Sequence, residues 1–182
     1  MQALTAAPTA ADIRTTHQAI ASLIHRTPIL TCQSIDRMAG ASLYFKCENF
    51  QKVGAFKARG ALAVVSSLDA KQREAGVTAV SAGNHAIATA FAARAAGTTA
   101  KIVMISTANP ARVAACQGYG AELVFTDDIH QAFAIAEQIQ REEGRFLVHP
   151  FEGHEIAAGT GTVGLEICEQ VDDFDALVVP IG

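Results

Sequence analysis

The sequence predicts an α/β fold with an open parallel sheet, and three observations lead to it. Short apolar runs that suit buried strands recur at residues 77–80, 101–105, 122–125 and 145–148. Alanine-rich segments with helical spacing separate these runs, and strands that alternate with helices form parallel sheets covered by helices. Of the 182 residues, 50% are hydrophobic, which is enough for a sizeable core that could divide into two lobes.

The first elements are predicted from a helix signature and a break. Residues 9–25 carry isoleucines at helical spacing, and the side chains of Thr9 and Asp12 can bond the free amides of a first turn. The Thr27-Pro28 pair interrupts this pattern. Beyond it, residues 42–47 are predicted to form a short strand.

The last elements are predicted to be a helix over residues 155–170 and a strand over residues 176–181. The strand prediction rests on a continuous apolar run, which is typical of a strand buried on both faces. Between the periodic segments, the polar stretch at residues 68–76 suits a domain edge. Pro150 and Gly153 mark a second crossing between domains, at residues 149–153.

Charge and cysteine content exclude several classes of function. The net charge is −4 and no basic run is present, so neither nucleic acid nor an anionic membrane is an expected partner. The amino end lacks the basic region and apolar core of a targeting signal, and we expect a cytoplasmic protein without a membrane span. The four cysteines are far apart and form no CxxC pair, which favours reduced thiols over disulfides, and no metal site is expected.

The stretch GAFKARGA, residues 54–61, places Lys57 where a loop turns into an apolar helix. A lysine near a helix start is usually solvated, with its stem along apolar surface. The neighbours here are mostly apolar, however, and desolvation lowers the pKa of a lysine and frees the neutral amine that attacks a carbonyl. A lysine that bonds covalently to an aldehyde is therefore the functional alternative.

The stretch VSAGNHA, residues 80–86, leads from a predicted strand through Ser81 and Gly83 into a helix that begins near Asn84. Exposed amides at such a turn, with the helix dipole behind them, suit an anion such as a carboxylate. Serine, glycine and asparagine are also ordinary turn and cap residues, so a purely structural role stays open. Taken alone, His85 suits a packing role better than that of a base.

The stretch GTGTVG, residues 159–164, matches the dinucleotide-binding pattern GxGxxG. That pattern requires a strand before it, and residues 155–158 do not form a convincing one. The chain ends before a ribose-binding acidic residue could appear at the expected offset of about 20 residues. Packing between helices explains these glycines better than binding of a nicotinamide cofactor.

Six stretches together resemble the threonine dehydratase and serine racemase branch of the fold-type II pyridoxal-phosphate enzymes. In chain order they are TPIL (27–30), YFKCENFQKVGAFKARGA (44–61), SAGNHA (81–86), GYGAELV (118–124), HPFEGHEIAAGTGTVGLEI (149–167) and VVPIG (178–182). They are collinear and cover nearly the whole chain. The resemblance implies a two-lobed, open parallel-sheet α/β fold whose large domain is incomplete here: residues 1–72 begin that domain, residues 73–150 form a small α/β domain and residues 151–182 return to the large one.

The resemblance also implies the cofactor, pyridoxal 5'-phosphate, and the residues that hold it. Lys57 would join it covalently and later act as the base at the substrate's α carbon. Phe56 would stack beside the pyridine ring, Asn84 would bond its phenolic oxygen, and Gly182 would begin the glycine loop around its phosphate. The turn that receives the substrate carboxylate would be formed by Ser81, Gly83, Asn84 and His85.

The reaction implied is dehydration of a β-hydroxy amino acid, L-threonine and/or L-serine, to a 2-oxo acid and ammonia. A 3-hydroxyaspartate dehydratase and a serine racemase are the alternatives. Histidine at position 85 favours the dehydratase branch over the sulfhydrylases, which carry threonine there. Racemases of the eukaryotic type use a second serine as an acid or base, and that position is Ala82, so dehydration is preferred.

Members of this family are longer than the present chain and continue beyond VVPIG into the phosphate loop. We therefore expect an incomplete portion of an enzyme that, at full length, forms a homo-oligomer, a dimer or tetramer, and acts on a small amino acid. The alternative from another class is an inactive truncated fragment that acts as a binding module. Either way, the isolated fragment is expected to be inactive and poorly soluble.

Overall fold

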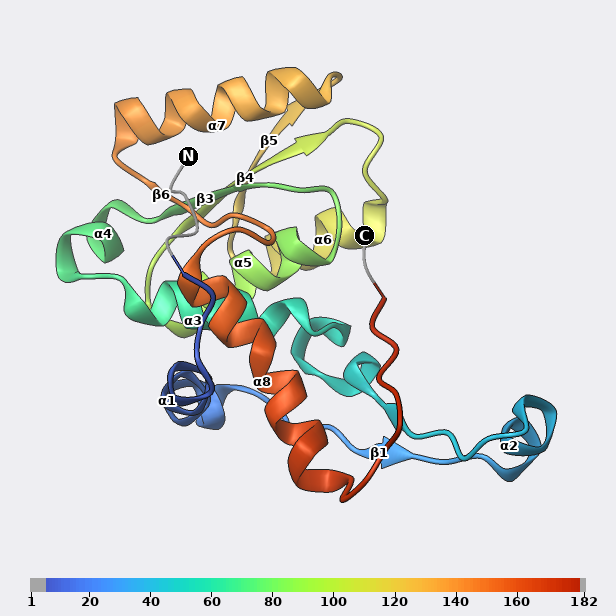
Figure 1. Ribbon diagram of the computed structural model, residues 1–182. Coiled ribbons are helices and arrows are strands. Elements are labelled where there is room, and N and C mark those ends of the chain that lie inside the picture. The colour runs from blue at the N-terminus through green and yellow to red at the C-terminus, as the bar shows by residue number, and fades with distance from the viewer. Residues whose placement is uncertain (1–5, 181–182) are drawn as a thin grey trace.

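A parallel sheet of four strands is the centre of the structure, a computed structural model that describes residues 6–180 (Figure 1). The strands are β3 (Val77–Val80), β4 (Ala100–Ile105), β5 (Glu122–Thr126) and β6 (Phe146–Leu147). Their order across the sheet is β5-β4-β3-β6, and Val77 of β3 lies opposite Ala100 on one side and Phe146 on the other. The predicted α/β fold and its four parallel strands are confirmed, although β6 is shorter than expected.

Helices cover both faces of this sheet. On one face lie α5 (Asn84–Ala95) and α6 (Pro110–Gly118), and on the other lies α7 (Ile129–Glu143) (Figure 1). The side chains between α7 and the sheet form one apolar cluster, which includes Val103 and Ala136, and a larger cluster fills the α5 side. All residues of β3 are buried for this reason, which is the pattern of a central parallel strand.

Further helices pack beneath α5. They are α1 (Ala10–Ile20), α3 (Lys57–Ser67) and α8 (His154–Gln170), while the short helix α4 (Ala70–Ala75) follows α3 and leads to β3. The predicted cap of α1 is confirmed, because Thr9 and Asp12 bond each other's backbone amides in a capping box. Helix α3 lies between α5 and α8 and so connects the sheet layer to the helices below it. Across residues 6–180 we find no helix with the length and apolar character that crossing a membrane requires.

The glycines of GTGTVG lie inside α8, and two of them, Gly159 and Gly161, pack helices together as the sequence predicts. A Cβ added to Gly159 would lie 2.6 Å from the Cβ of Ala63 and 2.6 Å from the carbonyl oxygen of Arg59, both on α3. A Cβ added to Gly161 would lie 2.8 Å from Cδ1 of Ile13 on α1. The small residues therefore allow α1, α3 and α8 to approach closely.

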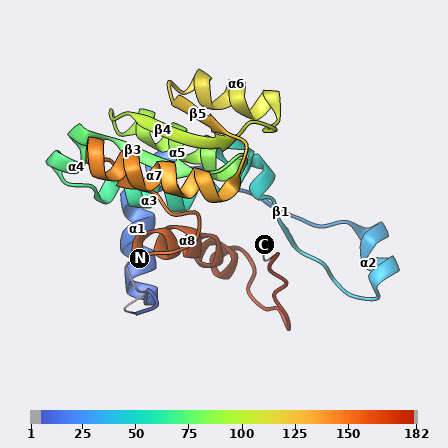
Figure 2. The same cartoon turned by 90° about the horizontal axis from the view of Figure 1, so that it is seen from above.

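An arm between the first and third α-helices extends away from the rest of the molecule (Figures 1 and 2). It contains β1 (Ile29–Leu30), α2 (Gln33–Ala39) and β2 (Phe45–Lys46), and short 3-10 helices flank it at Ala21–Leu23, Glu48–Phe50 and Lys52–Gly54. The two strands pair antiparallel over two residues each. The strand predicted over residues 42–47 is therefore shorter than expected, because only β1 is available to pair with it.

The prediction of a strand over residues 176–181 is wrong for residues 176–180, the part of this segment that the structure describes. Residues 176–180 form no strand, and the exposed fractions of Leu177, Val178 and Val179 are 53%, 92% and 60%. A strand buried on both faces needs neighbouring strands to satisfy its backbone groups. Within residues 6–180 no such neighbour pairs with this segment, so the apolar run stays extended and exposed.

Candidate active site

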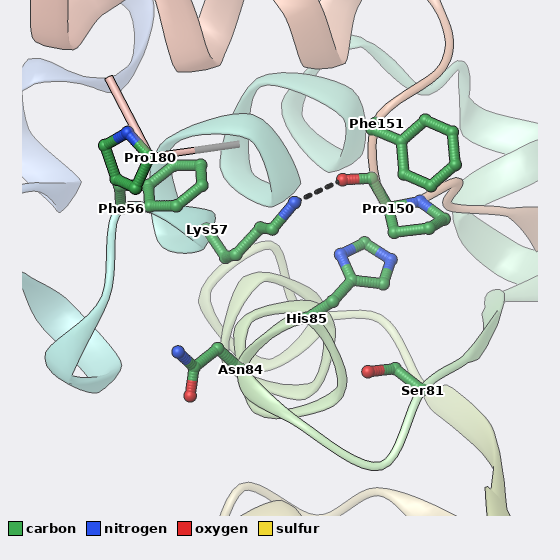
Figure 3. Close-up of a pocket in the computed structure, with 8 residues that line it drawn as sticks. All are labelled: Phe56, Lys57, Ser81, Asn84, His85, Pro150, Phe151 and Pro180. Atoms are coloured by element: carbon green, nitrogen blue, oxygen red, sulfur yellow. Dashed lines mark hydrogen bonds between the residues drawn. The ribbon is translucent and has the colours of Figure 1, made fainter. Parts of the chain in front are cut away.

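A cavity of about 490 Å³ lies where four segments meet, within the size range of small-molecule sites (Figure 3). The start of α3, the turn between β3 and α5, the loop between β6 and α8, and the segment after α8 contribute to it. Its lining residues are Phe56, Lys57, Ser81, Asn84, His85, Pro150, Phe151 and Pro180.

Lys57 is the first residue of α3, and its amine lies in this cavity. Its Nζ donates a hydrogen bond to the carbonyl oxygen of Pro150 at 2.7 Å and lies 5.1 Å from the centre of the Phe56 ring (Figure 3). Burial lowers the pKa of Lys57 below its ordinary value. The neutral amine is therefore more populated than for a solvated lysine, which favours attack on a carbonyl carbon.

The turn between β3 and α5 presents an uncapped helix end. Gly83 is the residue before the helix, and its backbone N–H donates to Oγ of Ser81 at 3.1 Å. No side chain caps α5, a helix of 12 residues, and the N–H of Ala86 donates to the carbonyl oxygen of Gly83, so the backbone N–H groups of Asn84 and His85 remain available to an anion. Asn84, the first helical residue, lines the cavity, and so does Ser81.

His85 is buried next to this turn, with 4% of its surface exposed. Its Nε2 lies 2.8 Å from the carbonyl oxygen of Val148, at the end of β6. Burial lowers the pKa of His85 to about 4, so the ring is neutral at physiological pH. Its other ring nitrogen, Nδ1, is buried and has no hydrogen-bond partner among the residues that the structure describes.

The loop between β6 and α8 supplies residues that the sequence reasoning missed. Pro150 provides the acceptor for Lys57, and Phe151 lines the cavity although 68% of its surface is exposed. Nδ1 of His149 accepts the backbone N–H of Glu152 at 2.9 Å, which holds the loop in shape. The stretch HPFEGHE is recognisable in the sequence, but its residues could not be assigned to the site from sequence alone. The pairing of β6 with β3 is what places this loop beside Lys57.

A buried ion cluster, formed by Arg59, Glu166, Lys46 and Glu48, fixes α3 on the side away from the cavity. Arg59 is fully buried, and its guanidinium donates to Glu166 at 2.7 Å and to Glu48 at 2.8 Å. Lys46 Nζ donates to Glu166 at 2.5 Å. Burial alone would raise the pKa of Glu166, but hydrogen bonds from Arg59 and Lys46 outweigh it and lower that pKa.

The structure brings most of the predicted site residues together. Phe56, Lys57, Ser81, Asn84 and His85 line one cavity, and Gly83 forms the turn behind it. Gly182 lies outside the described residues. No group of three metal-ligating side chains occurs in residues 6–180.

The residues that line the cavity suit an aldehyde cofactor with an aromatic ring. A lysine amine of lowered pKa can bond the aldehyde, and the adjacent Phe56 offers an apolar face to the ring. The free amides of α5 and the unpartnered nitrogen of His85 offer polar groups to whatever occupies the remaining space. Pyridoxal phosphate, which the sequence resemblance implies, has both an aldehyde and an aromatic ring.

Comparisons with known proteins identify relatives of this chain. The family model described as "Pyridoxal-phosphate dependent enzyme" matches residues 20–182. Phenylserine dehydratase of Ralstonia pickettii is 48% identical over 87% of this chain and 49% of its own length, and L-threo-3-hydroxyaspartate ammonia-lyase of Saccharomyces cerevisiae is 41% identical over 96% and 54%. The structure of maize serine racemase superposes with a TM-score of 0.91 and 40% identity over 93% of this chain and 52% of that one.

The chain thus spans about half the length of the curated relatives it matches. The match of the family model nevertheless extends over most of the chain, including the whole cavity described above. The chain therefore belongs to the family of pyridoxal-phosphate dependent enzymes.

Proposed function

We propose that the protein, at full length, is a dehydratase that converts a β-hydroxy amino acid, L-threonine and/or L-serine, to a 2-oxo acid and ammonia. The observation that carries the proposal is the position of the Lys57 amine, beside Phe56 and across the cavity from the uncapped start of α5. Two relatives named for dehydration or ammonia loss from hydroxy amino acids support it.

Each residue has a defined task in this proposal. The first-turn amides of α5 and the hydroxyl of Ser81 bind the substrate carboxylate. Phe56 packs against the cofactor ring and excludes water from it, while Asn84 bonds the ring's oxygen. Bound pyridoxal phosphate supplies an electron sink for the substrate's α carbon. Lys57 holds the cofactor and then takes the proton from that carbon, for which its lowered pKa is suited.

The substrate side chain distinguishes the alternatives. Ala82 offers no acid or base at the position where a two-base racemase needs one, so serine racemisation is a secondary candidate. A substrate with an aromatic β-substituent is a further candidate, because Phe151 lines the cavity with an exposed ring and because one relative is named a phenylserine dehydratase. The yeast relative's name adds 3-hydroxyaspartate.

The test of the proposal uses the full-length protein with pyridoxal phosphate. The Lys57→Ala variant should lose the absorbance band of the covalently bound cofactor and all formation of 2-oxo acid, while the Lys71→Ala variant, at a solvent-facing position, should keep both. A cofactor band that survives in Lys57→Ala contradicts the assignment of this lysine. A full-length wild-type protein that never binds pyridoxal phosphate contradicts the proposed function.

A comparison of substrates then tests the finer assignment. The ratio kcat/KM is measured for L-threonine, L-serine, 3-hydroxyaspartate and 3-phenylserine under one set of conditions. A higher value for threonine or serine supports the proposed substrate, and a higher value for one of the others replaces it. Chiral analysis of the remaining serine detects racemisation.

A further inference from the structure

The unpartnered ring nitrogen of His85 is a buried hydrogen-bond acceptor. The carbonyl oxygen of Val148 can only accept, so Nε2, at 2.8 Å from it, carries the ring proton. The ring is neutral because its pKa is about 4, and Nδ1 therefore presents a lone pair. Leaving a buried acceptor without a partner is unfavourable, and such groups in native structures call for an explanation.

Nδ1 faces Lys57. Figure 3 shows the His85 ring beside the Lys57 side chain. The ring nitrogen bonded to Cγ, which is Nδ1, lies on the side of the lysine. The positive charge of Lys57 is one of the influences that lower the pKa of His85, which agrees with this proximity. The charge of His149, in the loop before α8, acts on His85 in the same direction. Lys57 itself donates to Pro150 at 2.7 Å and has further N–H groups.

We propose that His85 is a positioning residue for Lys57: Nδ1 accepts a second hydrogen bond from the lysine amine while that amine is free. A neutral amine has two N–H groups and one lone pair. The carbonyl oxygen of Pro150 takes one N–H, and a rotation of the lysine side chain gives the other to Nδ1. The lone pair then points into the cavity, where the proposed function places the substrate's α carbon. The inference rests on that proposed role of Lys57.

The hydrogen bond between His85 and the carbonyl oxygen of Val148 supports this role. It fixes the ring orientation and the tautomer, so that the lone pair on Nδ1 stays directed at the lysine. The role is distinct from binding of the substrate carboxylate, which the backbone amides of the same turn would perform. It assigns a separate task to the histidine side chain.

Two substitutions separate the two ends of the ring. In His85→Asn, the amide oxygen stands near the position of Nδ1, but the side chain is too short to reach Val148. In His85→Gln, the amide N–H can reach the carbonyl oxygen of Val148, but no acceptor remains near the position of Nδ1. If the inference holds, kcat of the full-length holoenzyme falls about tenfold or more in His85→Gln and by no more than about threefold in His85→Asn, with KM little changed. The opposite order of the two variants overturns it, because it assigns the histidine a structural role through Val148.

A second measurement does not depend on catalysis. The reaction rate of Lys57 with an amine reagent, followed against pH by peptide mass spectrometry in the cofactor-free full-length protein, gives the pKa of this lysine. A neutral acceptor stabilises the ammonium more than the amine, so its removal lowers the pKa. The pKa of Lys57 should be lower in His85→Gln by about half a unit or more and nearly unchanged in His85→Asn.

Equal pKa values of Lys57 in all three proteins contradict the inference. Failure of the proposed function has a different signature, because it leaves the cofactor band intact in Lys57→Ala and does not alter the pKa comparison. His149 and Glu152, the other titratable groups around the loop, are unchanged in these proteins, so a difference in pKa reports on position 85 alone.

Discussion

Burial of a single histidine makes the stability of this fold depend on pH. An unfolded histidine binds a proton below about pH 6.5, whereas His85 in the folded protein does so only near pH 4. Between these values the unfolded state binds more protons, so the free energy of unfolding falls as the pH is lowered from 6.5 to 4. The contribution of His85 that is lost is on the order of 2–3 kcal/mol.

The prediction is tested by urea unfolding at several pH values between 4.5 and 7. The wild-type protein should lose about 2 kcal/mol more than His85→Gln over this range, because glutamine does not titrate. Comparing the two proteins cancels the titration of other groups. Parallel stability curves would mean that the folded protein accepts the proton on His85 without penalty.

At the scale of elements, the close approach of α8 to α3 depends on the absence of one side chain. A methyl group at Gly159 would meet the backbone of α3 at 2.6 Å, and backbone atoms cannot move aside cheaply. Gly159→Ala should therefore lower the free energy of unfolding by about 1–3 kcal/mol. Gly164→Ala is the matched control on the same helix, since no atom lies within 4 Å of the added Cβ, and it should stabilise by about 0.5–1 kcal/mol. Equal effects of both substitutions in urea unfolding would count against close packing of the helices.

The same helix carries one buried and one exposed glutamate, and both are paired with basic side chains. Glu166 is fully buried between Arg59 and Lys46, whereas Glu169 pairs with Arg26 at the surface. Glu166→Gln removes the carboxylate that Lys46 pairs with and one of the two that Arg59 pairs with, and it should destabilise the protein by about 3–5 kcal/mol. Glu169→Gln, the same chemical change three residues later, should cost less than about 1 kcal/mol. Denaturant unfolding of both variants measures the difference, and similar values would show that water compensates the buried cations.

At the scale of the whole molecule, the sequence predicts what depends on local pattern and misses what depends on distant partners. The strands β3 to β5 have apolar runs bounded by turn residues, and these signals are complete within each segment. The strand over residues 176–181 failed because an apolar run becomes a strand only where other strands pair with it. Pro150 was missed as an acceptor for the same reason, since only the pairing of β6 with β3 places its carbonyl beside Lys57.

The resemblance to a known family supplied site residues that pattern alone left ambiguous. By itself, His85 suited packing, and the structure shows a buried ring that hydrogen-bonds the carbonyl oxygen of Val148 and leaves Nδ1 without a partner among the described residues. The buried pair of Arg59 and Glu166 was not predicted, because charged residues 107 positions apart give no periodic signal before α3 and α8 are packed. Chemistry that arises from two separate elements becomes visible only in the assembled fold.

The distribution of exposed apolar side chains predicts how a protein of residues 1–182 behaves on its own. Met38 at the tip of the arm and Val178 after α8 have exposed fractions of 88% and 92%, and further large apolar residues are exposed near each of them. Apolar surface in contact with water favours association, so this chain should form larger species as its concentration rises. Sedimentation velocity between about 1 and 100 μM, the range in which exposed apolar surface drives aggregation, measures this. The Met38→Glu and Val178→Glu substitutions together should shift the chain toward monomer, and a wild-type chain that sediments as a monomer throughout would show that these surfaces do not attract one another.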